Sequence, residues 1–564
     1  MMKRLGWTII IATCVGVTIL PADEIPKKNA RPKLAVLLVF DQFRGDYFER
    51  WQDLYGEGGF KRLLADGAWF TNCHYPYSDT LTAPGHASLA TGSTPSRHGI
   101  VANDWYDRIK GATTTSVEDE RYQLLPAPPK TTPGASPWRR REETIGDVLL
   151  KTHKMGKVAS LSIKDRSAIL LAALFAQICY WFSIEQGIFV TSTYYRDQPH
   201  NWVTAFNRAR PADRWTEDFW LRMMPNLDYA KHTGPNSGAQ GIGYEQGSNF
   251  PHPFFRAKEK SDKDYYSAVT NSPMGNELLL ALAKRCIEAE KLGQGADTDL
   301  LCLSFSCNDL VGHCWGPDSE EVLDVTLRAD RLVKDLLDYL DAKVGAGKYV
   351  VALSADHGVC PIPEVTAKLG KKAGRVAPEA LKEKAAEALQ ESFAKDQKKL
   401  PWIEASYGPW LYFNRATLKE AKVTPAQAEK TVAAALAKVP GVLASFTRTQ
   451  IQDASLKGDP LLDRLRLSFH SANSGDVMIM PRPYHIISGS ITSPKAAAYR
   501  TTHGSPHAYD THVPLVVMGP GIQPGVRRER VVPQALAVIL AESLDLPPPS
   551  GAIAKVPPGV WMKR

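Results

Sequence analysis

Five apolar runs, each rich in β-branched residues and each ending in a polar or charged residue, constrain the fold of this chain most strongly. They are KLAVLLVFD (33–41), KVASLSIKD (157–165), DLLCLSFSCND (299–309), KYVVALSADH (348–357) and THVPLVVMG (511–519). Between them lie segments with helical spacing at 276–292, 322–344 and 532–546. Continuous apolar strands that alternate with amphipathic helices are typical of a parallel sheet covered on both faces, so the sequence predicts an α/β fold.

The N-terminal residues have the composition of an export signal. A short basic start precedes an apolar run that ends at Leu20, which predicts a signal peptide over residues 1–22 and a periplasmic or secreted protein. An uncleaved membrane anchor is the alternative, because the run approaches the length of a membrane span. No later segment is long and apolar enough to span a bilayer; the nearest, at 167–182, has 16 residues.

The rest of the chain divides into a large core and an insertion. We expect the core to comprise residues 31–362 and 471–564, with an excursion at 191–264 that is rich in Trp, Tyr, Pro and Asn. Residues 363–470 have two Ala/Lys/Glu-rich helical segments that alternate with short strand-like runs. This segment is predicted to be a small α/β subdomain and is a candidate lid over the site.

Charge and cysteine content exclude several classes of function. The net charge of +8 is spread along the chain without a basic run suited to nucleic acid, and it mildly favours anionic small molecules. Of the eight cysteines, Cys14 lies in the predicted signal, and the other seven contain no CxxC spacing. We expect the irregularly spaced Cys302, Cys307 and Cys314 to be packing residues or to form a local disulfide, and not to bind a metal. The sequence does not predict an oligomeric state.

Charged residues gather where the predicted strands end. Asp41, Lys164, Arg166, Asp309, Asp356 and His357 all follow apolar runs. In open α/β sheets, ligands bind beyond the carboxyl ends of the strands. His313 lies four residues after Asp309, so one helical turn places both on one face, and His503 precedes the last predicted strand.

These carboxylates and imidazoles suggest a pair of metal ions. Oxygen and nitrogen ligands without thiolate suit zinc, with another divalent ion as the alternative. Six such residues are more than one tetrahedral ion uses, and two ions a few ångströms apart can hold both oxygens of an in-line displacement. The simpler interpretation is that the aspartates cap helices or turns and that the histidines are satisfied core residues.

Thr82 lies at the predicted start of a helix, just before Pro84 and Gly85. Threonine is a good N-cap and Pro is favoured in the first turn, so a plain cap is one interpretation. Beside two metal ions, the hydroxyl of Thr82 is a candidate nucleophile, and the helix N-terminus offers backbone N–H groups to an anion.

The ordered set resembles the metal and nucleophile residues of the alkaline phosphatase superfamily. It is most similar to the bacterial phosphate-irrepressible alkaline phosphatases of the type I phosphodiesterase/nucleotide pyrophosphatase-like clan, which use a threonine nucleophile. The segments that carry the resemblance are DQFRGDYFERW (41–51), TAPGHASLATG (82–92), NDWYD (103–107), KDRSAIL (164–170) and THGSPHAYDTHVP (502–514).

The resemblance implies an alkaline-phosphatase-like fold and two Zn²⁺ ions that act on small-molecule phosphate monoesters through a phosphothreonine intermediate. It assigns one zinc to Asp41, Thr82, Asp356 and His357, and the other to Asp309, His313 and His503. It also assigns contacts with the phosphoryl oxygens to Asn103, Lys164 and Arg166. Two cations at a dry site would favour a dianionic monoester over a monoanionic diester.

Two alternative functions remain at this point. After KDRSAIL the chain continues with the apolar LAALFAQICYWF in place of the Pro-Ala-Gly-His-like segment expected in the family, which keeps a phosphodiesterase or nucleotide pyrophosphatase on the same metals open. The run Ser93–Arg97 is similar to a sulfatase signature. However, in sulfatases a Thr-Gly pair follows the nucleophile by nine residues. In this chain the Thr91–Gly92 pair follows Thr82 by nine residues, so the spacing gives the nucleophile's place to Thr82 and not to Ser93. A secreted binding protein with structural metals is the second alternative.

Overall fold

The computed structural model describes residues 31–127, 132–235, 246–254, 262–488 and 499–562. The predicted signal peptide at residues 1–22 lies outside this range. Within the described part, no helix combines the length and apolar character needed to cross a bilayer. The apolar segment 167–182 is divided between helix α6 (Asp165–Leu171) and strand β8 (Ile178–Ser183).

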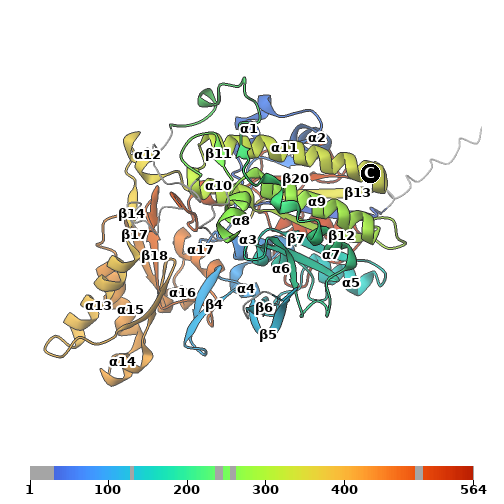
Figure 1. Ribbon diagram of the computed structural model, residues 1–564. Helices are drawn as coiled ribbons and strands as arrows, with labels where there is room; N and C mark the ends of the chain where they lie inside the picture. Colours follow the sequence, from blue (N-terminus) through green and yellow to red (C-terminus); the bar gives the residue numbers. More distant parts are fainter. Residues whose placement is uncertain (1–30, 128–131, 236–245, 255–261, 489–498, 563–564) are drawn as a thin grey trace, which may run out of the picture.

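A large mixed sheet forms the centre of the molecule (Figure 1). Its strand order is β21-β2-β20-β13-β1-β12-β7-β8-β9-β5-β6. The five central strands run parallel: β13 (Tyr349–Ser354), β1 (Leu34–Phe40), β12 (Asp299–Phe305), β7 (Val158–Ser162) and β8. Strands β1, β12, β13 and β7 are buried along their whole length, as continuous apolar runs predict. The predicted α/β fold with a covered parallel centre is confirmed.

The last predicted strand runs in the opposite direction to the central ones. Strand β20 (Leu515–Met518) pairs antiparallel with β13, and its first residue Leu515 lies opposite Ser354, the last residue of β13. The expectation that 511–519 extends the parallel sheet is therefore wrong. The chain reaches β20 from the loop that contains His503 through the short helix α18 (Ala508–Thr511). Because β20 begins opposite the end of β13, it runs back across the sheet.

Both flanks of the sheet add further antiparallel pairs. Beyond β20 lie β2 (Gly67–Phe70) and β21 (Gly525–Arg527), and β21 is parallel to β2. On the other side, β9 (Ile188–Ser192), β5 (Glu118–Leu125) and β6 (Pro133–Ala135) are each antiparallel to their neighbours.

Helices cover the two faces of this sheet. On one face, α9 (Pro273–Glu290) packs against α11 (Glu320–Leu340) and over β7 and β12. On the other face, α3 (Thr82–Thr91) packs between α6 and α19 (Ala535–Ser543). Figure 1 shows α11 and α3 on opposite sides of the central strands. Side-chain hydroxyls of Ser272 and Ser319 cap α9 and α11, which explains why these helices begin a few residues before the predicted starts.

A second, smaller sheet projects from the core, with α13–α15 at the lower left in Figure 1. Its strands are β15 (Ile403–Tyr407), β16 (Trp410–Phe413), β18 (Val477–Pro481) and β17 (Val442–Thr447), in that order. Helices α13 (Pro378–Phe393) and α15 (Pro425–Leu436) pack against it around a separate hydrophobic cluster. The sheet also includes β18, beyond the boundary drawn at residue 470; the division into domains stays a prediction.

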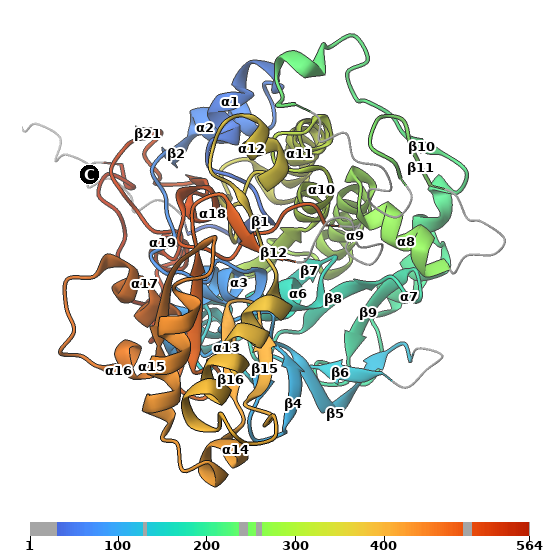
Figure 2. The same cartoon turned by 90° about the vertical axis from the view of Figure 1, so that its left-hand side faces the viewer.

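The aromatic-rich excursion packs against α11. Its short strands β10 (Phe219–Trp220) and β11 (His252–Pro253) pair with each other, and Trp220 Nε1 donates to the buried Asp324 carboxylate at 2.7 Å. Figure 2 shows β10 and β11 on the opposite side of the molecule from α13–α16.

All seven cysteines of the described residues are buried, and no disulfide bond joins any two of them. The option of a local disulfide among Cys302, Cys307 and Cys314 is therefore wrong, and these side chains belong to the main hydrophobic core. Cys302 lies on β12, whereas Cys307 and Cys314 lie at opposite ends of helix α10 (Cys307–Trp315).

Candidate active site

The charged residues that the sequence analysis identified lie at the carboxyl edge of the central strands. Asp41 directly follows β1, Asp356 and His357 follow β13, and Asp309 lies in the first turn of α10 after β12. Lys164 follows β7 as the N-cap residue of α6. Because parallel strands end at one edge, side chains far apart in sequence converge there. Asp41, Asp356 and His357 are completely buried.

Two overlapping groups of side chains have the spacing of metal ligands. Asp41, Asp356 and His357 form one group, and Asp309, His357 and His503 form the other. Within each group, the ligand atoms all lie within 4.8 Å of one another. His357 belongs to both, and its ring stacks on that of His503 with the centroids 3.4 Å apart. The structure therefore brings together residues from four separate segments.

His313 contacts this pair of groups through Asp309. Its Nε2 lies 3.1 Å from Asp309 Oδ1, as the four-residue spacing predicts. It is not a member of either group of three. Its ring lies 5.1 Å from that of His503, between the centroids.

The three imidazoles share one arrangement that prepares them to bind a metal. In each, Nδ1 donates to a backbone carbonyl: His313 to Thr501 at 2.7 Å, His357 to Gly358 at 2.9 Å and His503 to Thr80 at 2.8 Å. A carbonyl oxygen only accepts, so the hydrogen of the neutral ring is on Nδ1 and the lone pair is on Nε2. In all three, Nε2 faces a carboxylate of the cluster.

The protonation of the buried groups follows from their neighbours. Burial and the adjacent Asp309 and Asp356 carboxylates raise the pKa of Asp41 well above its usual value. Burial also lowers the pKa of His357 and of His503, which favours their neutral form. Two carboxylate oxygens of the cluster, Asp41 Oδ1 and Asp356 Oδ2, accept no hydrogen bond from the described residues. Unsatisfied buried oxygens beside neutral imidazoles fit a divalent cation.

Lys164 supplies the positive charge closest to these carboxylates. Its Nζ lies 2.7 Å from Asp41 Oδ2 and 2.5 Å from Asp309 Oδ2, so it joins the two ligand groups. Although burial opposes its charge, the Asp309 and Asp41 carboxylates raise the pKa of Lys164. The ammonium group is therefore charged and lies at the centre of the candidate site.

Thr82 lies beside the same cluster. Its Oγ1 is 3.4 Å from His357 Nε2, and its side chain is almost entirely buried. Thr82 is the first residue of α3, Leu81 is the N-cap residue, and neither side chain caps the helix. The interpretation of Thr82 as a plain N-cap is thus wrong. A Cβ on Gly85 would lie 2.3 Å from the Asp356 carbonyl oxygen, so this glycine lets α3 approach the end of β13.

Asn103 and Arg166 lie at the first turns of α3 and α6, respectively. Asn103 Oδ1 accepts a hydrogen bond from the backbone N–H of Ala83 at 2.9 Å, which attaches Asn103 to the first turn of α3. Arg166 follows Lys164 in the first turn of α6, and its Nε has no hydrogen-bond partner. Burial opposes the charge of Arg166, but the carboxylates of Asp165, Asp41 and Asp309 raise its pKa above the usual value.

The apolar segment that departs from the family pattern lies at the other end of α6. Leu174 N donates to Asp147 Oδ1 at 2.6 Å, and Arg140 donates to the carbonyl of Ala172 at 2.8 Å. Phe175 is 74% exposed. The replaced segment is thus held by residues around α5 (Ile145–Thr152), at the end of α6 opposite to Lys164.

The sequence analysis missed two residues of the site. His86 lies one turn after Thr82; its Nδ1 is 2.8 Å from Thr82 O and 3.2 Å from Asp356 Oδ2, and its Nε2 is 2.7 Å from Ser304 Oγ. Gln42 donates through Nε2 to Asp309 Oδ1 at 2.6 Å. The only signals were the four-residue spacing from Thr82 and the position after Asp41.

Comparisons with known proteins place the chain among phosphate ester hydrolases. The sequence model of the family described as "Type I phosphodiesterase / nucleotide pyrophosphatase" matches residues 35–506. The chain is 34% identical over 533 residues to alkaline phosphatase PafA of Elizabethkingia meningoseptica, which covers 94% of this chain and 95% of the relative. It is also 34% identical over 544 residues to alkaline phosphatase PhoV of Synechococcus elongatus, with 94% and 93% covered.

A solved structure agrees with these matches. The crystal structure of wild-type alkaline phosphatase PafA superposes with a TM-score of 0.85 at 33% identity, over 94% of this chain and 99% of that chain. The similarity therefore extends over the core and the projecting sheet together.

Proposed function

The chain belongs to the type I phosphodiesterase / nucleotide pyrophosphatase family, and on this premise we propose that it is a zinc-dependent alkaline phosphatase that hydrolyses small-molecule phosphate monoesters. Relatives that are named alkaline phosphatases cover nearly its full length, which supports the proposal. The observation that carries it is the common orientation of His313, His357 and His503, whose Nε2 atoms are all free to act as ligands beside buried carboxylates.

Two zinc ions are the proposed cofactors. Asp41, Thr82, Asp356 and His357 would hold one ion, and Asp309, His313 and His503 the other. Carboxylate and imidazole donors without thiolate are a common zinc set. Bound zinc would lower the pKa of a hydroxyl group and stabilise the oxygens that gain charge during displacement at phosphorus.

Thr82 is the proposed nucleophile. Its Oγ1 lies beside His357, and its position at the start of α3 puts backbone N–H groups next to it, where an anionic phosphoryl group is favoured. Attack of the deprotonated Oγ1 on phosphorus would break the bond between phosphorus and the ester oxygen, so that the alcohol leaves after taking up a proton and a phosphothreonine remains. Water would then displace Oγ1 from phosphorus, which releases inorganic phosphate and restores the hydroxyl group of Thr82. Two successive inversions predict net retention of configuration at phosphorus.

Asn103, Lys164 and Arg166 are proposed to hold the phosphoryl oxygens that do not react. Asn103 is attached to the first turn of α3, and Lys164 reaches between the carboxylates of Asp41 and Asp309. Two cationic side chains favour a dianionic monoester over a monoanionic diester. The apolar segment that differs from the family pattern lies at the end of α6 opposite to Lys164, away from the proposed phosphoryl contacts, which also supports the monoester assignment.

A phosphodiesterase or nucleotide pyrophosphatase on the same site is the second candidate, and the description of the family favours it. The test compares an aryl phosphate monoester with the matching diester on a preparation whose metal content is measured. Faster hydrolysis of the monoester supports the proposal, and faster hydrolysis of the diester supports the second candidate. Thr82→Ala should abolish turnover, whereas Thr113→Ala, at an exposed threonine, should not.

We also propose that the protein is exported, on the composition of residues 1–22. Fractionation of cells that express the full chain tests this. Protein that carries the N-terminal segment and remains in the cytoplasm would contradict it.

A further inference from the structure

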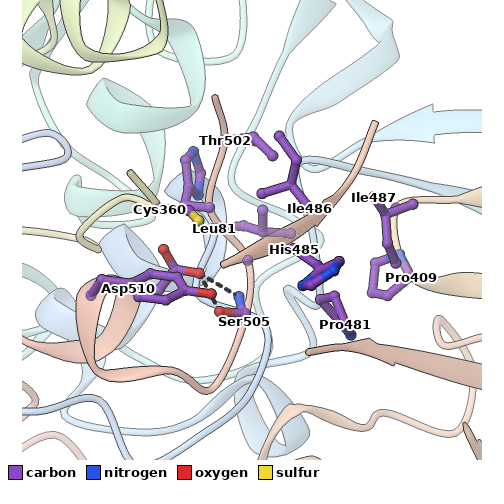
Figure 3. Close-up of a pocket in the computed structure, with 14 residues that line it drawn as sticks. Leu81, Cys360, Pro409, Pro481, His485, Ile486, Ile487, Thr502, Ser505 and Asp510 are labelled. Atoms are coloured by element: carbon purple, nitrogen blue, oxygen red, sulfur yellow. Dashed lines mark hydrogen bonds between the residues drawn. The ribbon is translucent and has the colours of Figure 1, made fainter. Parts of the chain in front are cut away.

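A pocket of about 150 Å³ opens beside the candidate metal site (Figure 3). His503 forms part of its wall, and so does Leu81, the residue before Thr82. The Nε2 of His503 faces Asp309 of the cluster, so this imidazole belongs both to the site and to the pocket. The pocket thus lies next to the candidate metal site, and His503 is the residue that the two share.

Apolar side chains form most of the remaining wall, and they come from the projecting sheet and the strand that follows it. Pro409 precedes β16, Pro481 ends β18, and Ile486 and Ile487 lie on β19 (His485–Ile487). The pocket therefore lies between the core and the inserted segment, where specificity is commonly determined.

One side of the pocket is polar. Ser505 donates to Asp510 Oδ2 through both its backbone N–H and its hydroxyl group, and Asp510 Oδ1 has no hydrogen-bond partner in the part of the chain that the structure describes. In Figure 3, this pair lies across the pocket from Pro409 and Ile487. The walls would thus enclose an apolar group and leave one buried carboxyl oxygen at its side.

We propose that this pocket binds the alcohol part of the ester, and that it selects a leaving group with a single aromatic ring or a short hydrocarbon chain. The inference rests on the proposed function, because it takes the bond that breaks to lie beside His503. Cavities of about 150 Å³ with apolar walls hold a benzene-sized molecule. A nucleoside exceeds this volume, so its base would extend out of the pocket.

The test removes apolar wall without changing a proposed ligand. Ile487→Ala shortens a half-buried side chain on β19, and Ile109→Ala is the matched control at an isoleucine that is 98% exposed. For each variant, kcat/KM is measured with benzyl phosphate and with methyl phosphate. We expect Ile487→Ala to lower kcat/KM for benzyl phosphate about tenfold and to leave methyl phosphate unchanged, because a few methylenes in an apolar pocket discriminate by about this factor.

A binding measurement makes the result independent of turnover. Dissociation constants of benzylphosphonate and methylphosphonate, neither of which has an ester bond to break, are measured on the zinc-loaded protein. Weaker binding of benzylphosphonate alone in Ile487→Ala supports the pocket. An equal effect on both phosphonates, or none on either, overturns it. Wild-type protein that hydrolyses neither ester would count against the proposed function, while the ratio of the phosphonate constants would still decide on the pocket.

Discussion

Asp79 of the core accepts a hydrogen bond from Trp410 Nε1 of the projecting sheet at 3.0 Å, across 331 positions of the chain. The backbone N–H groups of Ser78 and Asp79 both donate to Ser468 Oγ, each at 3.0 Å. Residues of the insertion therefore hold the loop that leads directly to Thr82.

This contact predicts a dependence of stability on pH. Burial raises the pKa of Asp79 from 3.8 to about 7. Between these values the folded protein binds a proton that the unfolded chain has lost, so the contribution of Asp79 to stability falls as pH rises through this window. Each unit of difference in pKa corresponds to about 1.4 kcal/mol.

Asp79→Asn removes the titration and keeps the shape of the side chain. The free energy of unfolding of Asp79→Asn minus that of the wild type should therefore increase from pH 4 to pH 7 and then level off. Denaturant titrations over this range measure it. Asp53→Asn, at an exposed aspartate, is the control, and a difference for Asp79→Asn that is flat with pH would contradict the raised pKa.

His86 is expected to position the proposed ligand Asp356. Its Nδ1 lies 3.2 Å from Asp356 Oδ2, and His86→Ala removes this contact from a completely buried carboxylate. Loss of a partner that orients a metal ligand typically weakens metal binding 10–100-fold. Competition with a chelator measures the zinc dissociation constant. His153→Ala, at a buried histidine bonded to Arg31, should leave that constant unchanged; if both variants weaken zinc equally, His86 has no specific role.

Lys164 is expected to determine the preference for monoesters. Lys164→Met keeps the aliphatic stem and removes the charge, so kcat/KM should fall by about tenfold or more for an aryl monoester and much less for the matching diester. Lys157→Met, where the ammonium group pairs with Glu290 on the surface, is the control. An equal loss of kcat/KM for both esters would show that Lys164 maintains the structure of the site but does not discriminate between substrates by their charge.

Zinc is expected to stabilise the folded protein. A ligand that binds only the folded state at 100 times its dissociation constant adds about 2.7 kcal/mol. Chelation should therefore lower the Tm, and elemental analysis should find two zinc ions per chain. Asp309→Asn should retain one ion and give a smaller shift in Tm on chelation; two ions in this variant would contradict the assignment of Asp309.

The architecture was largely predictable from local pattern. Side chains that avoid water on both faces identify the buried strands β1, β7, β12 and β13, and the spacing of Asp309 and His313 predicts the 3.1 Å approach of their side chains. The direction of β20 was not predictable in this way, because an apolar run reports burial and contains no information on which end enters the sheet.

The candidate site was predictable in composition but not in detail. Asp41, Asp356 and His357 follow strands that are evident as apolar runs in the sequence. The structure brings their ligand atoms within 4.8 Å of one another. His86 was missed because its significance depends on Asp356, which is 270 positions later in the chain. The contact of Lys164 with two carboxylates likewise joins three strand ends that no sequence window contains.

The sequence by itself determined which residue types follow the buried strands, and therefore the chemistry that the carboxyl edge of the sheet can perform. Only the tertiary structure decided the orientation of the imidazoles and the pocket beside them. The Nδ1 atoms of His313 and His503 bind carbonyls of Thr501 and Thr80, and the pocket joins Leu81 to Ile486. These contacts form between backbone and side-chain atoms that folding brings together from distant segments, whereas periodicity and spacing describe only neighbours along the chain.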